Sequence, residues 1–235
     1  MGKRSSTNKR IIDVPQVLDD SMFYGLELDD EQRLFRDSIW DTNHLIVFCN
    51  AKAGSGKTLI ATATGNLMVE YGLYHGLVYI CSPYGEDRQG FLPGTLVEKS
   101  EPYFEPFYQA LKKIRVDANI VSCEDIVNLK NGTGYIECMT HTFLRGVNFE
   151  NKVIIIDEAQ NFSFMDLKKT LTRISDSCKV IVIGHDKQCD IKTAEPENAF
   201  VKYLQHFKNE EHCAICHLTK NYRGWISQKA DEATI

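Results

Sequence analysis

The chain has 235 residues, a hydrophobic content of 43% and a formal net charge of −5. This length favours one α/β domain, and this apolar content is sufficient for a sizeable core. The negative net charge excludes attraction of nucleic acid by the molecule as a whole, so nucleic-acid binding would need a local basic patch. No apolar run approaches the roughly 20 residues of a membrane-spanning helix, and no apolar segment near the N-terminus is typical of a secretion signal. We therefore expect no membrane partner.

Eight cysteines are scattered along the chain, and several of them, such as Cys49 and Cys138, lie within apolar strand patterns. Cysteines placed in this way are typical of reduced core residues in a cytoplasmic protein. Residues 3–10 differ, because four basic side chains lie there among Ser, Thr and Asn. We expect a flexible basic N-terminal arm over residues 1–20 and one folded domain over residues 21–235.

The first predicted helix follows an acidic cap at residues 29–31 and carries the apolar residues Phe35 and Ile39. Residues 41–43 end the pattern. From the residues alone, Gln32 is interpreted as a solvated position in the first turn of this helix.

A predicted strand at residues 45–49 leads into Ala-Lys-Ala-Gly-Ser-Gly-Lys-Thr at residues 51–58, and a helical pattern follows. A glycine loop between a strand and a helix, with Lys-Thr at the helix start, is typical of a phosphate-binding loop. Gly54 and Gly56 let the backbone turn tightly and direct N–H groups at one anion, and the helix N-terminus adds partial positive charge.

In such a loop, Lys57 would reach the β- and γ-phosphates and the Thr58 hydroxyl would hold Mg²⁺. Ala51 stands where the motif has its first glycine, and it would strain the backbone if that position needed a positive φ. The alternative is a glycine-rich turn that carries a surface lysine.

The middle of the chain is less regular. Residues 77–81 predict a second buried strand, residues 84–100 predict a loop, and a helix is expected to begin at Glu101 with proline in its first turns. Its aromatic side chains suit base stacking and core packing equally well. Residues 115–150 predict a β-rich region, with strands at 119–121 and 135–138.

A second strong signal is the run of residues 152–158, Lys-Val-Ile-Ile-Ile-Asp-Glu. Consecutive β-branched residues indicate a central parallel strand that is buried on both faces, and ligands bind at the carboxyl ends of such strands. Two adjacent carboxylates repel each other unless one meets a cation and the other has a proton-transfer task. We therefore expect Asp157 to hold Mg²⁺ and Glu158 to act as the general base that orients the attacking water.

A further predicted strand at residues 179–183 is followed by Gly-His-Asp-Lys-Gln. Asp186 and Gln188 are candidates for sensing the γ-phosphate, and an ordinary strand-to-helix loop is the alternative. A helix is expected over residues 197–208.

Residues 213–218 contain Cys-x-x-Cys-His, a pattern that fits haem attachment, a zinc site or a plain strand. Haem attachment would need export, and a zinc site would need four ligands. The alternation through Cys213, Ile215 and His217 favours the strand. Near the end of the sequence, Arg223 could supply positive charge to a phosphoryl-transfer transition state, or it could be a surface arginine.

Taken in order, these motifs resemble those of the PhoH family, whose P-loop ATPase core is similar to the first domain of superfamily 1 helicases. The resemblance covers roughly residues 30 to 230, and its most specific parts are Leu-Pro-Gly at 92–94 and Asp-Glu-Ala-Gln-Asn at 157–161. It implies an α/β fold with three layers, the RecA-like P-loop core, and a mostly parallel sheet. ATP and Mg²⁺ are the implied ligands.

The resemblance also implies a role for each matching residue. Gln32 would read adenine, Gln160 and Gln188 would contact the γ-phosphate or couple to it, and Arg223 would touch the γ-phosphate. The implied phosphate and metal residues are Ala53, Gly54, Ser55, Gly56, Lys57, Thr58, Asp157 and Glu158. Where the family has Gly-Asp-x-x-Gln, this chain has His185 in the aspartate position and Asp186 one residue later, which puts the γ-phosphate contact in question.

The function expected from these residues is Mg²⁺-dependent ATP hydrolysis, coupled to RNA or another single-stranded nucleic acid. A single core of helicase type needs a closing surface, so a homo-oligomer is expected, with a hexameric ring favoured and Arg145, Arg173 or Arg223 reaching the neighbouring nucleotide. A nucleotide-dependent switch that hydrolyses slowly and binds a protein partner is the alternative. A small-molecule kinase is a third possibility, although no lid signature is present.

Overall fold

The computed structural model describes residues 13–83, 96–186 and 198–231, with the backbone alone for residues 96–99 and 231. Its centre is a sheet of six strands in the order β3-β2-β4-β5-β1-β6, and every neighbouring pair is parallel. The strands are β1 (Ile46–Ala51), β2 (Gly76–Cys81), β3 (Ile136–Thr140), β4 (Lys152–Ile156), β5 (Lys179–Gly184) and β6 (Cys213–Leu218). The prediction of a mostly parallel sheet is confirmed.

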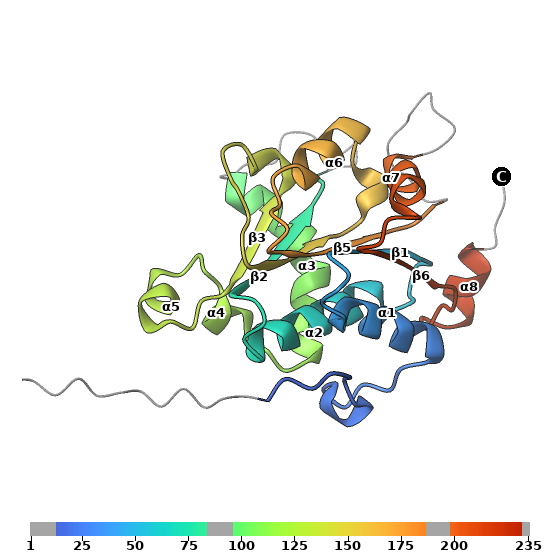
Figure 1. Cartoon of the computed structure of the whole chain (residues 1–235), viewed down its shortest axis with the longest axis horizontal. Coiled ribbons are helices and arrows are strands. Elements are labelled where there is room, and N and C mark those ends of the chain that lie inside the picture. Colours follow the sequence, from blue (N-terminus) through green and yellow to red (C-terminus); the bar gives the residue numbers. More distant parts are fainter. Residues whose placement is uncertain (1–12, 84–95, 187–197, 232–235) are drawn as a thin grey trace, which may run out of the picture.

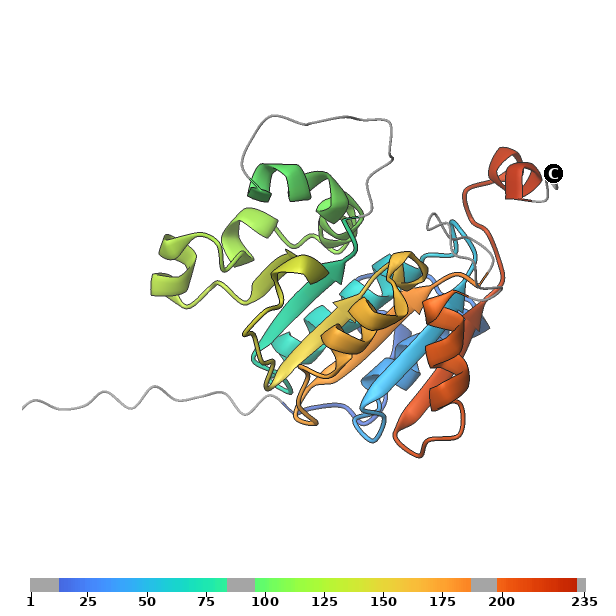
Figure 2. The ribbon, with the colours of Figure 1, turned by 90° about the horizontal axis from the view of Figure 1, so that it is seen from above.

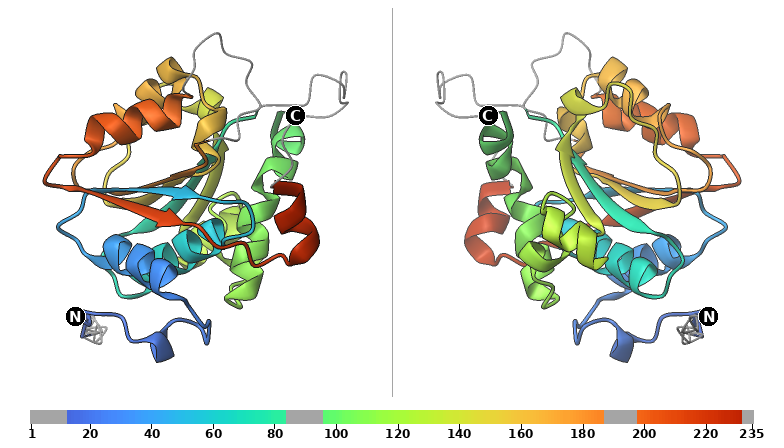
Figure 3. Two further views of the ribbon diagram at one scale, coloured as in Figure 1. Left: turned by 90° about the vertical axis from the view of Figure 1, so that its right-hand side faces the viewer. Right: turned by 90° about the vertical axis from the view of Figure 1, so that its left-hand side faces the viewer.

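Helices cover both faces of this sheet (Figure 1). One face carries α1 (Asp30–Trp40), α2 (Lys57–Glu70) and α3 (Leu96–Lys113), and the other carries α6 (Phe164–Leu171) and α7 (Ala199–Phe207). The view along the sheet shows the two helical layers with the strands between them (Figure 3). The three-layer α/β architecture is therefore as predicted. Within the described parts of the chain, we find no helix with the length and apolar character needed to cross a membrane.

The core has two halves because successive side chains of a strand point to opposite faces of the sheet. In β2, Leu77 and Tyr79 belong to the half of the core under α1, α2 and α3, whereas Val78 and Ile80 belong to the half on the side of α6 and α7. All four are at most 1% exposed. Burial of one such aliphatic side chain contributes about 1.5–3 kcal/mol. Burial on both faces explains why the strands are continuous apolar runs in the sequence.

The strand order places β5 between β1 and β4. The carboxyl ends of these three strands, at Ala51, Gly184 and Ile156, therefore lie at one edge of the sheet. The last helix, α8 (Trp225–Asp231), lies beyond this edge (Figure 2). In an open parallel sheet this edge is where ligands bind.

Two expectations for the middle of the chain are wrong. Residues 119–121 are not a strand but part of the short helix α4 (Ala118–Val121), because the Asp117 carboxylate caps it by accepting from the Asn119 N–H. A second short helix, α5 (Ile126–Asn131), follows. Helix α3 begins at Leu96, before the predicted start, and its buried apolar face holds it together through Pro102 and Pro106.

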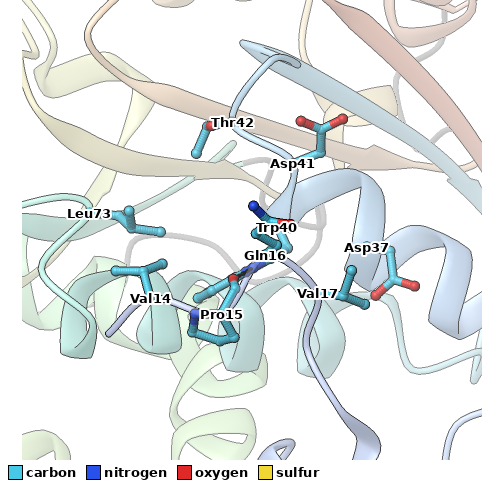
Figure 4. A pocket seen from close by; sticks show the side chains of 9 residues that line it. All are labelled: Val14, Pro15, Gln16, Val17, Asp37, Trp40, Asp41, Thr42 and Leu73. Atoms are coloured by element: carbon cyan, nitrogen blue, oxygen red, sulfur yellow. Dashed lines mark hydrogen bonds between the residues drawn. The ribbon is translucent and has the colours of Figure 1, made fainter. Parts of the chain in front are cut away.

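The boundary of the expected N-terminal arm is also placed too late. Residues 13–20 pack against the domain, because Leu18 is 1% exposed and the Trp40 indole donates a hydrogen bond to the Pro15 carbonyl at 2.9 Å. Next to this segment is a cavity of about 530 Å³ (Figure 4). It is lined by Val14, Pro15, Gln16, Val17, Asp37, Trp40, Asp41, Thr42 and Leu73. These residues precede β1 and β2, so the cavity lies at the amino end of the sheet, away from the phosphate loop.

Candidate functional site

The glycine loop connects β1 to α2 as predicted. Gly54 and Gly56 have φ values of 73° and 87°, and a Cβ on Gly54 would lie 2.6 Å from the Asn221 side-chain oxygen. Only glycine suits this combination of backbone angle and close contact. Ala51 is the last residue of β1 and does not have a positive φ, so alanine is accommodated there without backbone strain.

The start of α2 has the features of an anion site. This helix of 14 residues has Gly56 as its N-cap, and no side chain caps its first N–H groups. Those groups carry partial positive charge. The Ser55 hydroxyl is buried beside them and has no hydrogen-bond partner among the described residues. An orphan buried hydroxyl and uncapped N–H groups together fit phosphate oxygens as their partners.

The two carboxylates after β4 face this loop. Asp157 has no exposed surface, and its Oδ2 accepts hydrogen bonds from the Thr58 and Tyr79 hydroxyls, both at 2.8 Å. Glu158 Oε1 lies 2.8 Å from Lys57 Nζ. A hydroxyl and a carboxylate that meet in this way are a donor set suited to Mg²⁺, which prefers oxygen ligands.

The charges of Asp157, Glu158 and Lys57 act on one another. Burial raises the pKa of Asp157, and the neighbouring Glu158 charge raises it further, against the opposing effects of Lys57, Tyr79 and Thr58. Burial also acts to raise the pKa of Glu158, but the Lys57 ammonium outweighs burial and holds that pKa below its usual value. Glu158 is therefore ionised at neutral pH and can accept a proton or orient a water molecule.

Glu158 has a strained backbone. Its φ of 48° and ψ of 46° lie in the left-handed region, which residues other than glycine rarely adopt. The short helix η3 (Ala159–Asn161) follows directly. Within it, the Gln160 side-chain nitrogen donates a hydrogen bond to the Glu158 carboxylate, and the Gln160 side-chain oxygen accepts one from the His185 N–H at 3.0 Å. Strain of about 1–3 kcal/mol at a strand end is typical of a functional position.

Gln32 is not the solvated residue that the helical pattern indicated, because it is 8% exposed. Its amide oxygen accepts from the Asp29 N–H at 3.1 Å, and its amide nitrogen donates to the Ser55 carbonyl at 2.9 Å. It thus completes a capping box at the start of α1 and supports the phosphate loop at the same time.

The chain after β6 returns to the loop. The Tyr222 N–H donates to the Gly54 carbonyl at 2.9 Å, and the side-chain carbons of Arg223 lie against Gly54. The Glu31 carboxylate holds the start of this segment by accepting from Thr219. The structure therefore places Arg223 beside Gly54 of the loop, close enough for its charge to act on Lys57.

The remaining candidates either lie outside the described residues or have their described contacts elsewhere. Gln188 lies outside the described residues. The Asp186 N–H donates to the Asn50 side chain at 3.1 Å, and the Asp186 carboxylate lies beside His185. Arg145 is exposed on a loop, and the Arg173 guanidinium lies by the Val147 carbonyl at the amino end of the sheet.

The Cys-x-x-Cys-His segment forms β6, so the strand interpretation is confirmed. Across the described residues, no group of three or more His, Cys, Asp or Glu side chains is arranged to hold a metal ion.

Two contacts were not anticipated from the sequence. Tyr79 reaches Asp157 from the middle of an apolar strand, where nothing in the pattern separates it from core residues. Asn221 lies within the stretch that contains Arg223, but its oxygen covers Gly54 and also accepts from the Arg223 N–H at 2.8 Å. The sequence signal that could have indicated this contact is the polar residue Asn221 two positions before Arg223.

Comparison with solved structures gives slight likenesses. The HK97 bacteriophage large terminase aligns with a TM-score of 0.49 and 14% identity, covering 87% of this chain and 42% of that one. The helicase domain of Pyrococcus furiosus Hef aligns with a TM-score of 0.48 and 14% identity, covering 80% and 38%. Likenesses of this size are no guide to activity.

Comparison with protein sequences is decisive for the family. Protein PhoH2 of Bacillus subtilis is 30% identical over 219 residues, which is 91% of this chain and 49% of that protein. Protein PhoH of Escherichia coli K12 is 34% identical over 148 residues, or 62% of this chain and 40% of that protein. The chain thus spans half or less of the length of these curated relatives. The PhoH family model, described as PhoH-like protein, matches residues 27–232, and the chain therefore belongs to the PhoH family.

Proposed function

We propose that residues 21–235, together with the packed segment at residues 13–20, act as one ATPase domain that binds ATP with Mg²⁺ between the phosphate loop and the end of β4. One observation carries the proposal: Lys57 and Thr58 meet Glu158 and Asp157, which directly follow β4, each across 2.8 Å. Family membership and the uncapped start of α2 support it. This arrangement provides phosphate binding, metal binding and a base within one cluster.

Each residue then has a defined task. Lys57 and the loop N–H groups bind the phosphates, and Thr58 and Asp157 hold the metal. The ion, when bound, neutralises charge that develops on the phosphate oxygens. Glu158 orients water and accepts its proton, Gln160 fixes the Glu158 carboxylate, and Arg223 adds positive charge beside the loop.

The test is ATP turnover by the purified chain with Mg²⁺ and with EDTA, with Glu158→Gln as the variant. Turnover should fall by about 10²–10⁴-fold in the variant while a fluorescent ATP analogue still binds. Glu150→Gln is a matched control, because Glu150 is an exposed carboxylate. Turnover that is absent from the unmodified chain, or equal in the variant, would refute the proposed hydrolysis.

Coupling to RNA or single-stranded DNA is the second part of the proposal. A groove of about 570 Å³ between α6 and α7 supports it, because Phe164 and Tyr203 stack there with their ring centroids 4.9 Å apart. Lys168 and Lys202 also line the groove. Aromatic faces with nearby cations suit single-stranded nucleic acid. ATP turnover should rise when RNA is added, and no stimulation at any salt concentration would favour a nucleotide-dependent switch with a protein partner.

A homo-oligomer, with a ring favoured, and a cytoplasmic location complete the proposal. Trp225 and Ile226 of α8 are 72% and 79% exposed beside Arg223, and large exposed apolar side chains mark contact surfaces. Light scattering at several protein concentrations tests assembly, and a monomer throughout would refute it.

A further inference from the structure

Tyr79 connects β2 to the proposed metal site from a strand that carries no part of either motif. It lies opposite Ile155 in the β2–β4 register, so its side chain shares the face of the sheet with Asp157, which is two residues after Ile155 and directly follows β4. Its hydroxyl donates to Asp157 Oδ2 at 2.8 Å, and the residue is 1% exposed. The contact is therefore dry and directed at a carboxylate.

The ring of Tyr79 is held in one place by helix α3. It stacks on Phe107 with centroids 4.7 Å apart and planes inclined at 21°, and it meets Phe104 edge-on at 6.4 Å. Phe104 and Phe107 are at most 4% exposed. Stacked and edge-on pairs of this kind contribute about 0.5–1.5 kcal/mol beyond the area that they bury. The hydroxyl consequently has little freedom to leave Asp157.

Asp157 needs such a donor because its carboxylate has no exposed surface. The other side-chain donor to Oδ2 is Thr58, which is itself a proposed metal ligand. The remaining carboxylate oxygen, Oδ1, accepts from the Glu158 N–H at 2.8 Å. Tyr79 is thus a side-chain donor to Asp157 that has no other task at the metal.

We infer that Tyr79 is a positioning residue for the Mg²⁺ site: its hydroxyl fixes the Asp157 carboxylate, and its ring anchors that carboxylate to α3. This inference rests on the proposed function. Residues that orient a metal ligand typically change metal affinity by 10–100-fold when they are removed. The Tyr79 hydroxyl acts on a carboxylate in this way.

The test uses Tyr79→Phe, which removes the hydroxyl and keeps the ring. A fluorescent ATP analogue is titrated with Mg²⁺, and the Mg²⁺ concentration for half-maximal tight binding should rise about tenfold, while binding in EDTA stays unchanged. Tyr135→Phe is the matched control, because it also removes a tyrosine hydroxyl that donates at 2.7 Å, to Asn66. That variant should bind Mg²⁺ and nucleotide like the unmodified chain.

A second variant, Phe107→Leu, removes the stacked ring and keeps the Tyr79 hydroxyl. It should raise the required Mg²⁺ concentration about two- to threefold, less than Tyr79→Phe. Unchanged Mg²⁺ dependence in both variants, or an equal change in Tyr135→Phe, would overturn the role of Tyr79. If the unmodified chain itself binds nucleotide without any response to Mg²⁺, the proposed function fails instead.

Discussion

Two lysine side chains are largely withdrawn from solvent at opposite ends of the same sheet, Lys179 fully and Lys57 with 14% of its side chain exposed, and their surroundings differ. Lys57 lies beyond the carboxyl end of β1 and pairs with Glu158 at 2.8 Å. Lys179 is the first residue of β5, has no exposed surface and meets uncharged acceptors. These acceptors are the backbone carbonyl oxygens of Ser38, Asp41 and His44. The Lys57 ammonium group therefore faces a carboxylate with full negative charge, whereas the Lys179 ammonium group faces backbone carbonyls at the C-terminal end of α1 and in the turn after it.

The two pKa values move in opposite directions. Burial lowers the pKa of Lys179 to about 7, and the nearby Asp41 carboxylate offsets this only in part. Burial also acts to lower the pKa of Lys57, but the charges of Glu158 and Asp157 outweigh it, and the pKa lies above the usual value. A buried lysine among carbonyls holds backbone together, whereas one among carboxylates has a charge that a phosphate can share. The partners of each ammonium group, and not its burial, therefore set the direction in which its pKa moves.

The largest effect should come from replacing the functional lysine. Lys57→Met should lower kcat/KM for ATP by about 10²–10³-fold, because a cation that faces developing negative charge is lost. Its free energy of unfolding should change by less than about 1 kcal/mol, since the Glu158 side chain is 43% exposed and water can solvate it. Steady-state turnover and urea unfolding measure the two quantities. A variant that keeps its turnover would remove Lys57 from the catalytic cluster.

The structural lysine should show the reverse pattern. Lys179→Met should lower the free energy of unfolding by about 2–4 kcal/mol, because three part-buried carbonyl groups lose their charged donor. Turnover per folded molecule should stay within about twofold, as Lys179 is at the amino end of β5 and the cluster lies at the carboxyl ends of the strands. Lys208→Met, at an exposed lysine after α7, is the control for loss of charge. A loss of activity without loss of stability would contradict the assignment.

The two lysines also illustrate which features of the fold and of the candidate site could be predicted from the sequence. Each of the six strands overlaps a predicted one, and four of them follow from continuous apolar runs. The phosphate loop follows from Gly54, Gly56 and Lys57, because those glycines are required by local backbone geometry. The short helix α4 was predicted as a strand because Ile120 and Val121 are β-branched. Ile120 is 54% exposed, and the Asp117 cap, not burial, decides the local structure.

Local sequence patterns could not predict the contacts between residues that lie far apart in the sequence. Lys179 begins a strand, where a lysine ordinarily faces water, and its acceptors come from residues about 140 positions earlier. Tyr79 is indistinguishable from its apolar neighbours until β2 and β4 are paired. Gln32 donates to the Ser55 carbonyl because α1 packs beside α2, and the hydrophobic periodicity of either helix does not predict that hydrogen bond. Each case depends on topology and not on spacing.

The low pKa of Lys179 makes the comparison sensitive to pH. An unfolded lysine has a pKa of about 10.4, so between about pH 7 and pH 10 the unfolded chain binds more protons than the folded chain at this position. The folded state is therefore favoured as the pH rises through this window, by at most roughly 1.4 kcal/mol per pH unit. The difference in free energy of unfolding between the unmodified chain and Lys179→Met should grow from pH 7 to pH 9.5.

Measuring that difference, and not the stability of one protein, cancels the other groups that titrate in the same range. Buried thiols such as Cys81 and Cys138 have raised pKa values, which act to lower stability at alkaline pH, but they are common to both proteins. A difference that is constant from pH 7 to pH 9.5 would mean that Lys179 stays protonated throughout. The three carbonyl contacts would then be strong enough to offset its burial.

Gln32 combines a structural contact with one at the proposed site, since it caps α1 and supports the phosphate loop. Its replacement should give the smallest of these effects, and the most selective one. Its amide still has one N–H and one oxygen lone pair to spare, so an adenine ring could bind it without breaking either contact. Gln32→Met should lower the free energy of unfolding by about 1 kcal/mol through the lost half of the capping box. Binding of ATP should weaken several-fold and the preference for ATP over GTP should fall, as competition against a fluorescent analogue would measure. Leu34→Met, at a 60% exposed position of the same helix, controls for the methionine itself. If both nucleotides weaken equally, Gln32 supports the loop alone, and the base must be read by other residues.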